Sequence, residues 1–496
     1  MIVEELATQI MQTFGFVPTA DQAKATAVFS RFLLDRDGSS VMIMRGSAGT
    51  GKTSLAAAIV KTLVKLRQRV ILLAPTGRAA KVFSVNAGRP AFTVHRRIYR
   101  QKTFAGESTG FSLNDNMYHD TLFIVDEASM IANGGGGEGA VFGTGCLLDD
   151  MVSFVYGGHN CRMMIIGDMA QLPPVGEEES PALMADFMAG YGLKVYQCDL
   201  NEILRQASGS GILYNATEIR SMITHDEVTR LPKITFSGFA DIRMVPGGEL
   251  IEQLNSSYSE VGTDETIVIT RSNKRANAYN AGIRGMVLGR EEELTTGDML
   301  MVVRNNYYWT EKAAAEEKAL EDSSTSNGDG RKAESQALPF IANGDRAMVV
   351  RVRNLREFYG LHFANVWLQF PDYDNYEIMV TAVTDSLMAE APALTREQSE
   401  RLFNGVMEDY QDVPLKADRL KKVRQDPCYN ALQIKYAYAV TCHKAQGGQW
   451  AHIYVDQGYM TDDMLSPDYI HWLYTAFTRA TEKLFLVNWP KTQTEG

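Results

Sequence analysis

Apolar runs alternate with helical patterns along the first 200 residues of the chain. These runs have the length of buried strands, and each is followed by polar or Gly-rich turn residues. The runs are VMIMR (41–45), VILLAP (70–75), TLFIVDEA (121–128), CRMMIIGD (161–168) and LKVYQCDL (193–200). Strands that alternate with helices predict a parallel sheet with helices on both faces. We expect a first α/β domain over residues 1–200, with two helices in residues 1–37.

A second series of strands and helices follows the same alternation. It consists of TIVITR from Thr266, a helix from Lys274, YAYAVT from Tyr436, HIYVD (452–456), a helix from Asp468 through Arg479, and LFLVN (484–488). The pattern predicts a second parallel-sheet domain that is assembled from residues 201–290 and 431–496.

Between the two pieces of this second domain the pattern changes. Residues 297–309 and 340–352 are strand-like with turn signals, and NVWLQF and YEIMVTAV add further strands. Short strands separated by turns predict a small β-barrel, inserted over residues 291–430.

Three segments stand apart from these strands. Residues 310–338 are polar and turn-rich, which predicts a mobile loop, and GGGGEG (134–139) predicts a second one. Residues 392–427 are charged and have a helical pattern. We expect this last segment to be extra helical material within or beside the barrel.

Composition narrows the class of protein. No apolar run approaches the length of a bilayer-spanning helix, and the N-terminus lacks the basic region and apolar core of a secretory signal. The five cysteines show no paired spacing, which argues against a disulfide framework and a structural zinc site. We therefore expect a cytoplasmic protein of bacterial or phage type, with no membrane partner.

The charge is unevenly distributed. The chain has a net charge of -11, but the stretch from Gly38 to Ala105 contains no Asp or Glu and thirteen Lys and Arg residues. The rest of the chain has 49 - 13 = 36 basic residues against all 60 acids, a net charge of -24. A solvated basic face is one explanation. A phosphate site or a track for a polyanion is the other.

The basic stretch contains a phosphate-loop pattern. GSAGTGKT (46–53) fits G-x-x-x-x-G-K-[ST] between a predicted strand and a predicted helix. Backbone amides of such a loop wrap phosphates, the lysine reaches the β- and γ-phosphates, and the threonine hydroxyl binds Mg²⁺. The candidate ATP-binding residues are Gly46, Ser47, Ala48, Gly49, Thr50, Gly51, Lys52 and Thr53.

Two acids follow the strand TLFIV. Asp126 at the end of a buried strand would bind Mg²⁺, and Glu127 would polarise the attacking water. The alternative is that these residues only cap a helix, since Asp and Ser are good N-caps. Their position downstream of a phosphate loop favours the catalytic interpretation. Gln171 lies in another acidic turn. It either senses the γ-phosphate or positions the water, or it belongs to a rigid Pro-rich turn without chemistry.

Ten segments, in order along the chain, resemble the motifs of superfamily 1 DNA helicases, specifically the RecD-like and Dda-like branch that moves 5′ to 3′. They are PTADQ (18–22), GSAGTGKT, APTGRAAK (74–81), FTVHRRIY (92–99), IVDEASM, GDMAQLPPVG, LNEILRQ (200–206), ITRSNKRAN (269–277), VTCHKAQGGQW (440–450) and YTAFTRA (474–480). The long loop after IVDEASM and the extra segments 310–338 and 392–427 depart from the family pattern.

The resemblance implies a fold and a set of roles. It implies two RecA-like parallel-sheet P-loop domains with ATP and Mg²⁺ between them, and an inserted SH3-like β-barrel. Gln22 would contact adenine, while Arg205 and Arg479 would complete the ATP site from the second domain. A strand-separating pin would lie within residues 98–120, whose aromatic residues are Tyr99, Phe104 and Phe111. The positions that match DNA-backbone contacts are Thr76, Arg78, His95, Thr441, His443 and Lys444.

The function that follows is an ATP-dependent DNA helicase that translocates on single-stranded DNA and unwinds duplex junctions. Such a motor is compatible with a monomer and with roles in DNA repair, recombination or replication. One alternative is a DNA-stimulated ATPase or translocase subunit of a recombination or nuclease complex, without unwinding of its own. A more distant alternative is a non-enzymatic adaptor, and an RNA substrate also stays open because backbone contacts discriminate weakly.

Overall fold

The computed structural model of the chain describes residues 2–104, 107–134, 142–202, 209–224, 230–323 and 340–495. The chain forms two compact units. The first contains Met1–Pro246 and Ala445–Gly496, and the second contains Gly247–Lys444. Each unit is described by itself, and the domain boundaries inferred from the sequence stay predictions.

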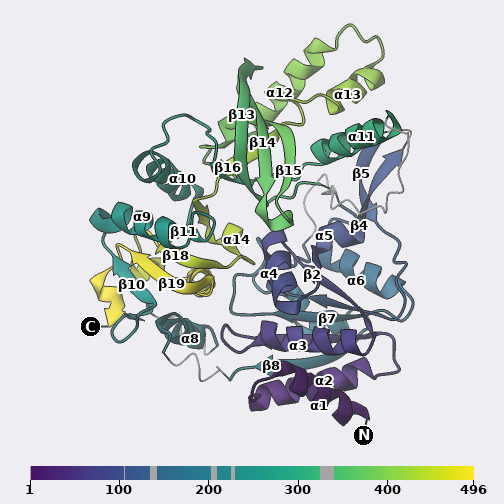
Figure 1. Cartoon of the computed structure of the whole chain (residues 1–496), viewed down its shortest axis with the longest axis vertical. Coiled ribbons are helices and arrows are strands. Elements are labelled where there is room, and N and C mark those ends of the chain that lie inside the picture. Colours follow the sequence, from purple (N-terminus) through teal and green to yellow (C-terminus); the bar gives the residue numbers. More distant parts are fainter. Residues whose placement is uncertain are drawn as a thin grey trace. The chain divides into compact units, whose positions relative to one another are not determined.

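A six-stranded parallel sheet forms the centre of the first unit (Figure 1). Its strand order is β3-β2-β6-β7-β1-β8. The strands are β1 (Ser40–Gly46), β2 (Arg69–Ala74), β3 (Ala91–Thr93), β6 (Thr121–Val125), β7 (Arg162–Gly167) and β8 (Lys194–Leu200). All five strands predicted in the first 200 residues are confirmed, and β3 is an additional short one. The carboxyl ends of parallel strands meet at one edge of the sheet, where binding sites of open α/β sheets lie.

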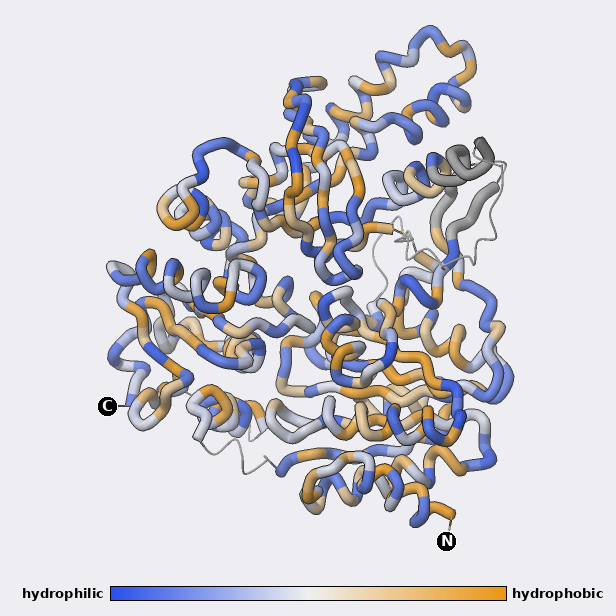
Figure 2. The backbone as a smooth tube through the Cα atoms, viewed as in Figure 1, coloured by the Kyte–Doolittle hydropathy of each residue, from blue (hydrophilic) through white to orange (hydrophobic). Residues whose placement is uncertain are grey.

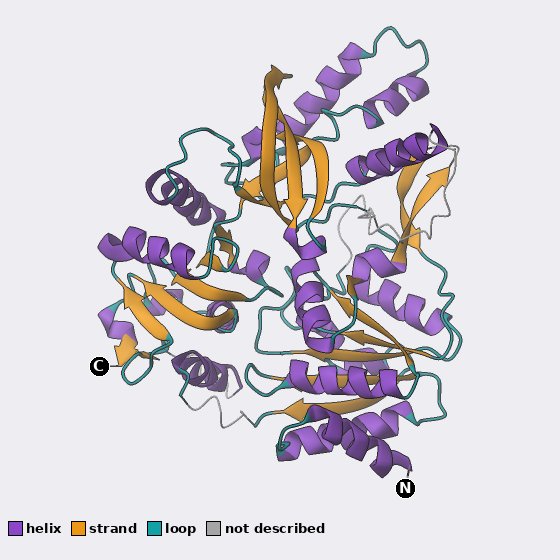
Figure 3. Cartoon of the chain, viewed as in Figure 1, coloured by secondary structure: helices purple, strands orange, loops and turns teal. Residues whose placement is uncertain are grey.

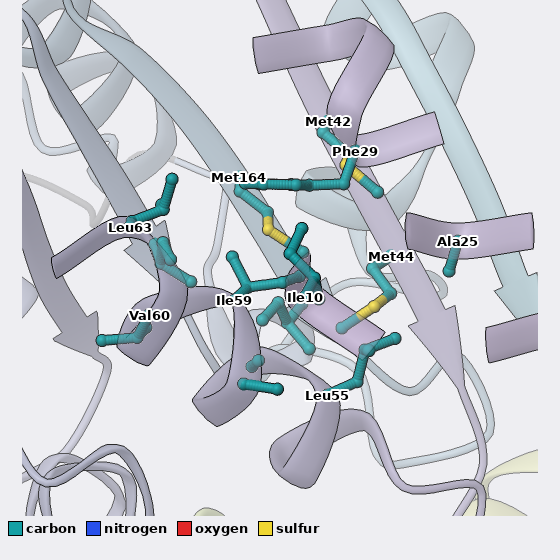
Figure 4. Packing of buried hydrophobic residues seen from close by; sticks show 14 of the residues in the cluster. Ile10, Ala25, Phe29, Met42, Met44, Leu55, Ile59, Val60, Leu63 and Met164 are labelled. Carbon is teal, nitrogen blue, oxygen red and sulfur yellow. The ribbon is translucent and has the colours of Figure 1, made fainter. Parts of the chain in front are cut away.

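Helices cover both faces of this sheet because successive strand residues point to opposite sides. Met42 and Met44 of β1 pack on one face, against the first three helices of the chain (Figure 4). Val41 and Ile43 pack on the other face, among residues of α5 and α6. Orange, hydrophobic stretches of the chain lie in the region of this sheet in Figure 2. The helices are α1 (Ile2–Phe14), α2 (Ala20–Leu33), α3 (Lys52–Lys65), α4 (Gly77–Ala87), α5 (Val94–Ile98), α6 (Leu147–Gly157) and α7 (Ala185–Ala189).

The remainder of the first unit contains further parallel strands and helices. Strand β19 pairs in parallel with both β10 and β18, and β9 pairs with β20. These elements are α8 (Gly211–Thr224), β9 (Ile234–Thr235), β10 (Ile242–Val245), β18 (Trp450–Asp456), α15 (Pro467–Phe477), β19 (Ala480–Val487) and β20 (Thr494–Glu495). The helix and the two strands predicted between residues 452 and 488 are therefore present.

An antiparallel hairpin lies within the segment predicted to contain the pin. It consists of β4 (Tyr99–Phe104) and β5 (Glu107–Leu113), and Tyr99 pairs with Leu113 at its base. Phe111 packs on Phe142, with ring centroids 5.0 Å apart. A hairpin has the shape that strand separation needs, and its role as a pin stays a prediction.

The second unit contains a closed five-stranded barrel (Figure 3). The order around the barrel is β12-β13-β14-β15-β16. Its pairings are antiparallel except for a short parallel contact between β15 and β16. The strands are β12 (Met299–Val302), β13 (Arg346–Phe358), β14 (Leu361–Phe370), β15 (Tyr376–Val383) and β16 (Leu432–Tyr436). Outside the barrel, β11 (Thr266–Thr270) and β17 (Ala439–Thr441) form a parallel pair.

The helices of the second unit include α11, which lies where the sequence predicted a loop. They are α9 (Leu250–Glu260), α10 (Asn273–Gly282), α11 (Tyr308–Ser323), α12 (Arg396–Asp409), α13 (Lys416–Arg424) and α14 (Cys442–Ala445). Helices α12 and α13 confirm the helical pattern of residues 392–427. The mobile loop predicted from residue 310 was wrong as far as Ser323, because Ala, Glu and Lys are good helix formers even where the composition is polar. Residues 324–338 and 135–139 lie outside the described residues.

Trp309 anchors the first turn of α11. Its side chain is buried, and its Nε1 donates a hydrogen bond to the carbonyl of Asn430 at 2.9 Å. The strand predicted to extend to this residue was therefore wrong at its end. The predicted fold class is confirmed in its two kinds of architecture, helix-covered parallel sheets and a closed β-barrel.

Two further findings concern the chain as a whole. None of the helices among the described residues is long and apolar enough to cross a membrane. All five cysteines are free thiols with buried side chains.

The buried carboxylate of Asp298, just before the first barrel strand, forms an ion pair with Arg284, which follows α10. Asp298 is completely buried, and Arg284 donates to both of its oxygens at 3.0 and 2.9 Å. Arg290 and the amide of Thr295 donate at 2.7 and 2.8 Å. Burial alone would raise the pKa of Asp298, but these hydrogen bonds outweigh it and the pKa lies below its ordinary value. The carboxylate is therefore ionised and fully paired.

Asp298→Ala should destabilise the protein by about 3–5 kcal/mol, because it leaves the buried Arg284 guanidinium unpaired. Thermal unfolding measures the loss, with the exposed Asp412→Ala as the control. Since folding lowers the pKa of Asp298, its stabilisation is present above the unfolded pKa of about 4 and is lost as the pH falls through the folded pKa. Equal melting temperatures for the two variants at pH 7 would contradict this role.

Candidate nucleotide-binding site

The loop between β1 and α3 has the backbone that a phosphate loop requires. Gly49 and Gly51 adopt positive φ angles of 76° and 80°, which residues with a side chain rarely adopt. A Cβ on Gly46 would lie 2.8 Å from Thr50 Oγ1 and 2.9 Å from the Cβ of Leu200. Each of these glycines is needed for the close turn, which ends at the first turn of α3 where backbone amides are free to bind an anion.

Lys52 lies at the start of α3 and folds back over the loop. Its Nζ donates to the carbonyls of Gly46 at 2.5 Å and Ser47 at 2.8 Å. Both acceptors are neutral, so a polyphosphate in the loop offers the ammonium group stronger, charge-assisted hydrogen bonds. Thr53 follows in the first turn of α3, with a half-buried side chain.

Gln22 holds the phosphate loop from α2. Its side chain is completely buried, its Nε2 donates to the carbonyl of Thr50 at 2.9 Å, and its Oε1 accepts from the amide of Thr19. Thr19 and Gln22 thus form the capping box that begins α2. The predicted contact with adenine stays a prediction, but the structure places Gln22 directly against the loop.

The two predicted acids follow β6 at the same edge of the sheet. Burial, and then the neighbouring Glu127 carboxylate, raise the pKa of Asp126 to about 7. Glu127 adopts a left-handed backbone with φ 52°, and its side chain does not cap the short helix that follows. A non-glycine residue in this region is strained, and such strain is common at functional sites. The N-cap position of this short helix thus makes no side-chain hydrogen bond, which gives the capping alternative no support, and the catalytic roles of Asp126 and Glu127 stay predictions.

Arg479 and Gln171 meet the second acid. Arg479 is 2% exposed, and its Nη1 lies 3.4 Å from Glu127 Oε1. With the Gln171 amide oriented to satisfy both neighbours, its nitrogen donates to Glu127 Oε2 at 3.1 Å and its oxygen accepts from Arg479 Nη2 at 2.8 Å. Three predicted residues from distant parts of the sequence thus form one hydrogen-bonded cluster.

Two residues that the sequence analysis did not single out contact the phosphate loop. The hydroxyl of Tyr474 accepts a hydrogen bond from the amide of Ala48 at 3.0 Å. Arg220 of α8 donates to Ser47 Oγ at 3.0 Å and to Asn201 Oδ1 at 2.9 Å. Tyr474 begins the same YTAFTRA segment that contains Arg479, whereas no sequence signal marked Arg220. Arg205 lies outside the described residues.

The oxygen donors present suit magnesium. Mg²⁺ prefers oxygen ligands and is usually held by one or two carboxylates together with substrate phosphates. Thr53 supplies a hydroxyl, and Asp126 supplies a buried carboxylate whose pKa burial raises more than the charges of Lys52 and Arg479 lower it. Among the described residues, no cluster of three or more His, Cys, Asp or Glu side chains could hold a metal by itself. The donor set therefore fits an ion that arrives with a nucleotide.

The predicted DNA-contact residues of the first unit lie on α4 and α5. Thr76 caps α4 through its side chain, and Arg78 donates to the carbonyl of Gln449 at 2.8 Å. His95 packs near the rings of Tyr99 and Phe142, and burial lowers its pKa to about 4. His95 is therefore neutral at pH 7 and offers a hydrogen bond rather than a charge.

The predicted DNA-contact residues of the second unit are Thr441, His443 and Lys444. Thr441 ends β17, and the other two lie on the short helix α14. Lys444 Nζ donates to Asn343 Oδ1 at 3.3 Å, and burial, together with the charge of Lys435, lowers its pKa to about 8. It is still mostly protonated at pH 7, so it can serve as a cation for a phosphate.

Family models match two parts of the chain. An AAA domain model matches residues 19–231, and a UvrD-like helicase C-terminal domain model matches residues 436–487. The first match contains the phosphate loop, both acids and Gln171. The second contains Tyr474 and Arg479.

Among curated proteins, the chain is similar to two helicases. It is 26% identical over 264 residues to the ATP-dependent DNA helicase dda of Enterobacteria phage T4, covering 52% of this chain and 55% of that protein. It is 30% identical over 180 residues to the ATP-dependent RecD2 DNA helicase of Deinococcus radiodurans, covering 36% of this chain and 21% of that protein. The matched regions thus span about half of one relative and about a fifth of the other.

Solved structures of Pif1 helicases are also similar to the chain. A Bacteroides Pif1 helicase in complex with ADP-AlF3 and ssDNA matches at 15% identity with a TM-score of 0.45, over 97% of this chain and 95% of that one. Pif1 helicase from Candida albicans matches at 16% identity with a TM-score of 0.38.

Proposed function

We propose that this chain, which belongs to the superfamily 1 DNA helicases of the RecD-like and Dda-like type, is an ATP-driven motor that moves 5′ to 3′ on single-stranded DNA and unwinds duplex junctions. The observation that supports the proposal most strongly is the Glu127–Gln171–Arg479 cluster in the same unit as the phosphate loop. A phosphate loop alone would support only nucleotide binding.

Each group of the site has a step in ATP hydrolysis. Lys52 leaves the loop carbonyls to bind the β- and γ-phosphates, and Thr53 with Asp126 would hold Mg²⁺. The ion would supply charge neutralisation for the phosphates. Glu127 accepts a proton from the attacking water, while Gln171 orients that water. Arg479 contributes positive charge as negative charge develops on the γ-phosphate.

DNA contact in this proposal is made through the phosphate backbone. Thr76, Arg78, His95, Thr441, His443 and Lys444 are the proposed contacts. Backbone contacts carry no sequence information, which suits a motor that must move along any sequence. Translocation then follows if ATP binding and hydrolysis change how the two sets of contacts hold the strand. We place the activity inside the cell, in DNA repair, recombination or replication.

Single-stranded DNA should raise the rate of ATP hydrolysis strongly, and a duplex with a 5′ tail should be unwound while one with a 3′ tail is not. Phosphate release and strand displacement measure the two effects, with Lys52→Ala as the inactive control. Hydrolysis that no nucleic acid stimulates would contradict the motor. Stimulation without displacement of either duplex would instead support the translocase-subunit alternative, and equal stimulation by RNA would remove the preference for DNA.

A further inference from the structure

One buried hydroxyl bridges the phosphate loop and the loop that carries Gln171. Tyr474 is 1% exposed, and its hydroxyl accepts from the amide of Ala48 at 3.0 Å. The same hydroxyl donates to Asp168 Oδ2 at 2.6 Å. The distance to Asp168 is that of a charge-assisted hydrogen bond. A single side chain from α15 therefore contacts both loops at once.

Asp168 passes this contact to the catalytic cluster. Its Oδ1 accepts from the amide of Ala170 at 3.0 Å, and its carbonyl accepts from the amide of Gln171 at 3.2 Å. The carboxylate thus fixes the turn from which the Gln171 side chain extends to Glu127 and Arg479. A shift of Asp168 would move Gln171 away from both partners.

Helix α15 holds the same loop at two further points. Thr475 Oγ1 accepts from the amide of Leu172 at 2.8 Å, and the ring of His471 lies 2.9 Å from the carbonyl of Ala170. Arg479 Nε in turn donates to the carbonyl of Thr475 at 3.3 Å. Helix α15 thus places Tyr474 at the phosphate loop. The residues that follow its last turn place Arg479 at Glu127.

The protonation of Tyr474 suits a permanent donor. Burial, and then the Asp168 carboxylate, raise the pKa of Tyr474 well above its ordinary value. The hydroxyl is therefore protonated at neutral pH. The hydroxyl donates its hydrogen bond to Asp168 and accepts one from the amide of Ala48, so it is used both as a donor and as an acceptor.

We propose that Tyr474 is a positioning residue for ATP hydrolysis, which links the phosphate loop through Asp168 to the placement of Gln171 and Arg479. The inference rests on the proposed ATPase. Tyr474 is not a catalytic residue, since it acts through Asp168. Its hydroxyl should affect the rate of the chemical step and leave nucleotide affinity largely unchanged.

Tyr474→Phe keeps the buried ring and removes only the bridge. We expect kcat to fall about tenfold, as is typical for a lost hydrogen bond to a charged group, with the affinity for ATP changed less than twofold. Tyr469→Phe is the matched control. It also removes a buried hydroxyl from α15, but that hydroxyl donates to Gln457 and contacts neither loop of the site. A wild-type kcat, or an equal loss of kcat and affinity together with a lower melting temperature, would overturn the positioning role.

A double-mutant cycle with Asp168→Asn tests the link itself. Asn keeps an oxygen for the amide of Ala170 but removes the charge that Tyr474 faces. If the two residues act as one bridge, the double variant should lose little more kcat than the stronger single variant. Effects that multiply would overturn the link. If Tyr474→Phe does not fold, Asp168→Asn decides alone: reduced kcat at unchanged ATP affinity supports the link, and unchanged kcat overturns it.

The failure of this inference is distinguishable from failure of the proposed function. If Lys52→Ala hydrolyses ATP at the wild-type rate, the phosphate loop is not the active site and the proposed ATPase fails. If hydrolysis depends on Lys52 but Tyr474→Phe has wild-type kcat, the ATPase stands and only the bridge is wrong.

Discussion

Lys52→Ala should reduce the rate of ATP hydrolysis by at least about 100- to 1,000-fold, the loss typical of removing one preorganised donor from a developing charge. Lys52 Nζ is the cation at the centre of the loop, where it now donates to the carbonyls of Gly46 and Ser47. Those carbonyls are neutral and can bind water instead, so the substitution should leave the fold intact. Phosphate release in the presence of single-stranded DNA measures the rate, and thermal unfolding checks the fold.

A matched control exists on the same helix. Lys61→Ala removes an exposed lysine from α3 and changes the net charge by the same amount. It should hydrolyse ATP normally. Lys52→Arg should stay nearly inactive, because a planar guanidinium does not replace a compact ammonium group inside a tight loop. Wild-type hydrolysis by Lys52→Ala would place the active site elsewhere in the molecule.

The sequence predicted the phosphate loop and the acids because each depends on local spacing. GSAGTGKT follows a buried strand and precedes a helix, so Gly49, Gly51 and Lys52 fall where a parallel sheet places its binding edge. Asp126 and Glu127 directly follow β6, a strand whose residues are all buried. In such cases the motif and the strand together determine where the side chain lies.

Residues whose role depends on tertiary packing could not be predicted in this way. Arg220 contacts Ser47 only because α8 packs near the loop, and 173 positions separate the two residues in the sequence. Tyr474 lay inside a recognised segment, but nothing in that segment showed that its hydroxyl would meet Ala48 and Asp168. Helix α11 was missed for another reason: its polar composition suggested a loop, while the buried Trp309 supplies the anchor that holds it.

The Glu127–Gln171–Arg479 cluster also explains why a substitution of Arg479, which is far from the phosphate loop in the sequence, should greatly reduce the rate of ATP hydrolysis. Arg479 is buried, and its guanidinium donates to the carbonyls of Thr475 and Gly448 at 3.3 Å each. These contacts fix the group before ATP binds, so little reorganisation is needed when charge develops on the γ-phosphate. The free energy of this interaction should therefore appear in the transition state rather than in nucleotide binding.

Arg479→Ala should lower kcat by about 10³-fold or more, the scale measured for arginines that face a transferring phosphoryl group. The affinity for ATP should change far less, and binding of a non-hydrolysable analogue measures it separately from the rate. Lys491→Ala, which removes an exposed cation from the same unit, is the control for charge. Arg479→Lys keeps the charge but cannot reach Glu127, Gln171 and the two carbonyls together, so it should recover only part of the rate. A variant that lost affinity but hydrolysed bound ATP at the wild-type rate would show that Arg479 holds the nucleotide and does not act on the transition state.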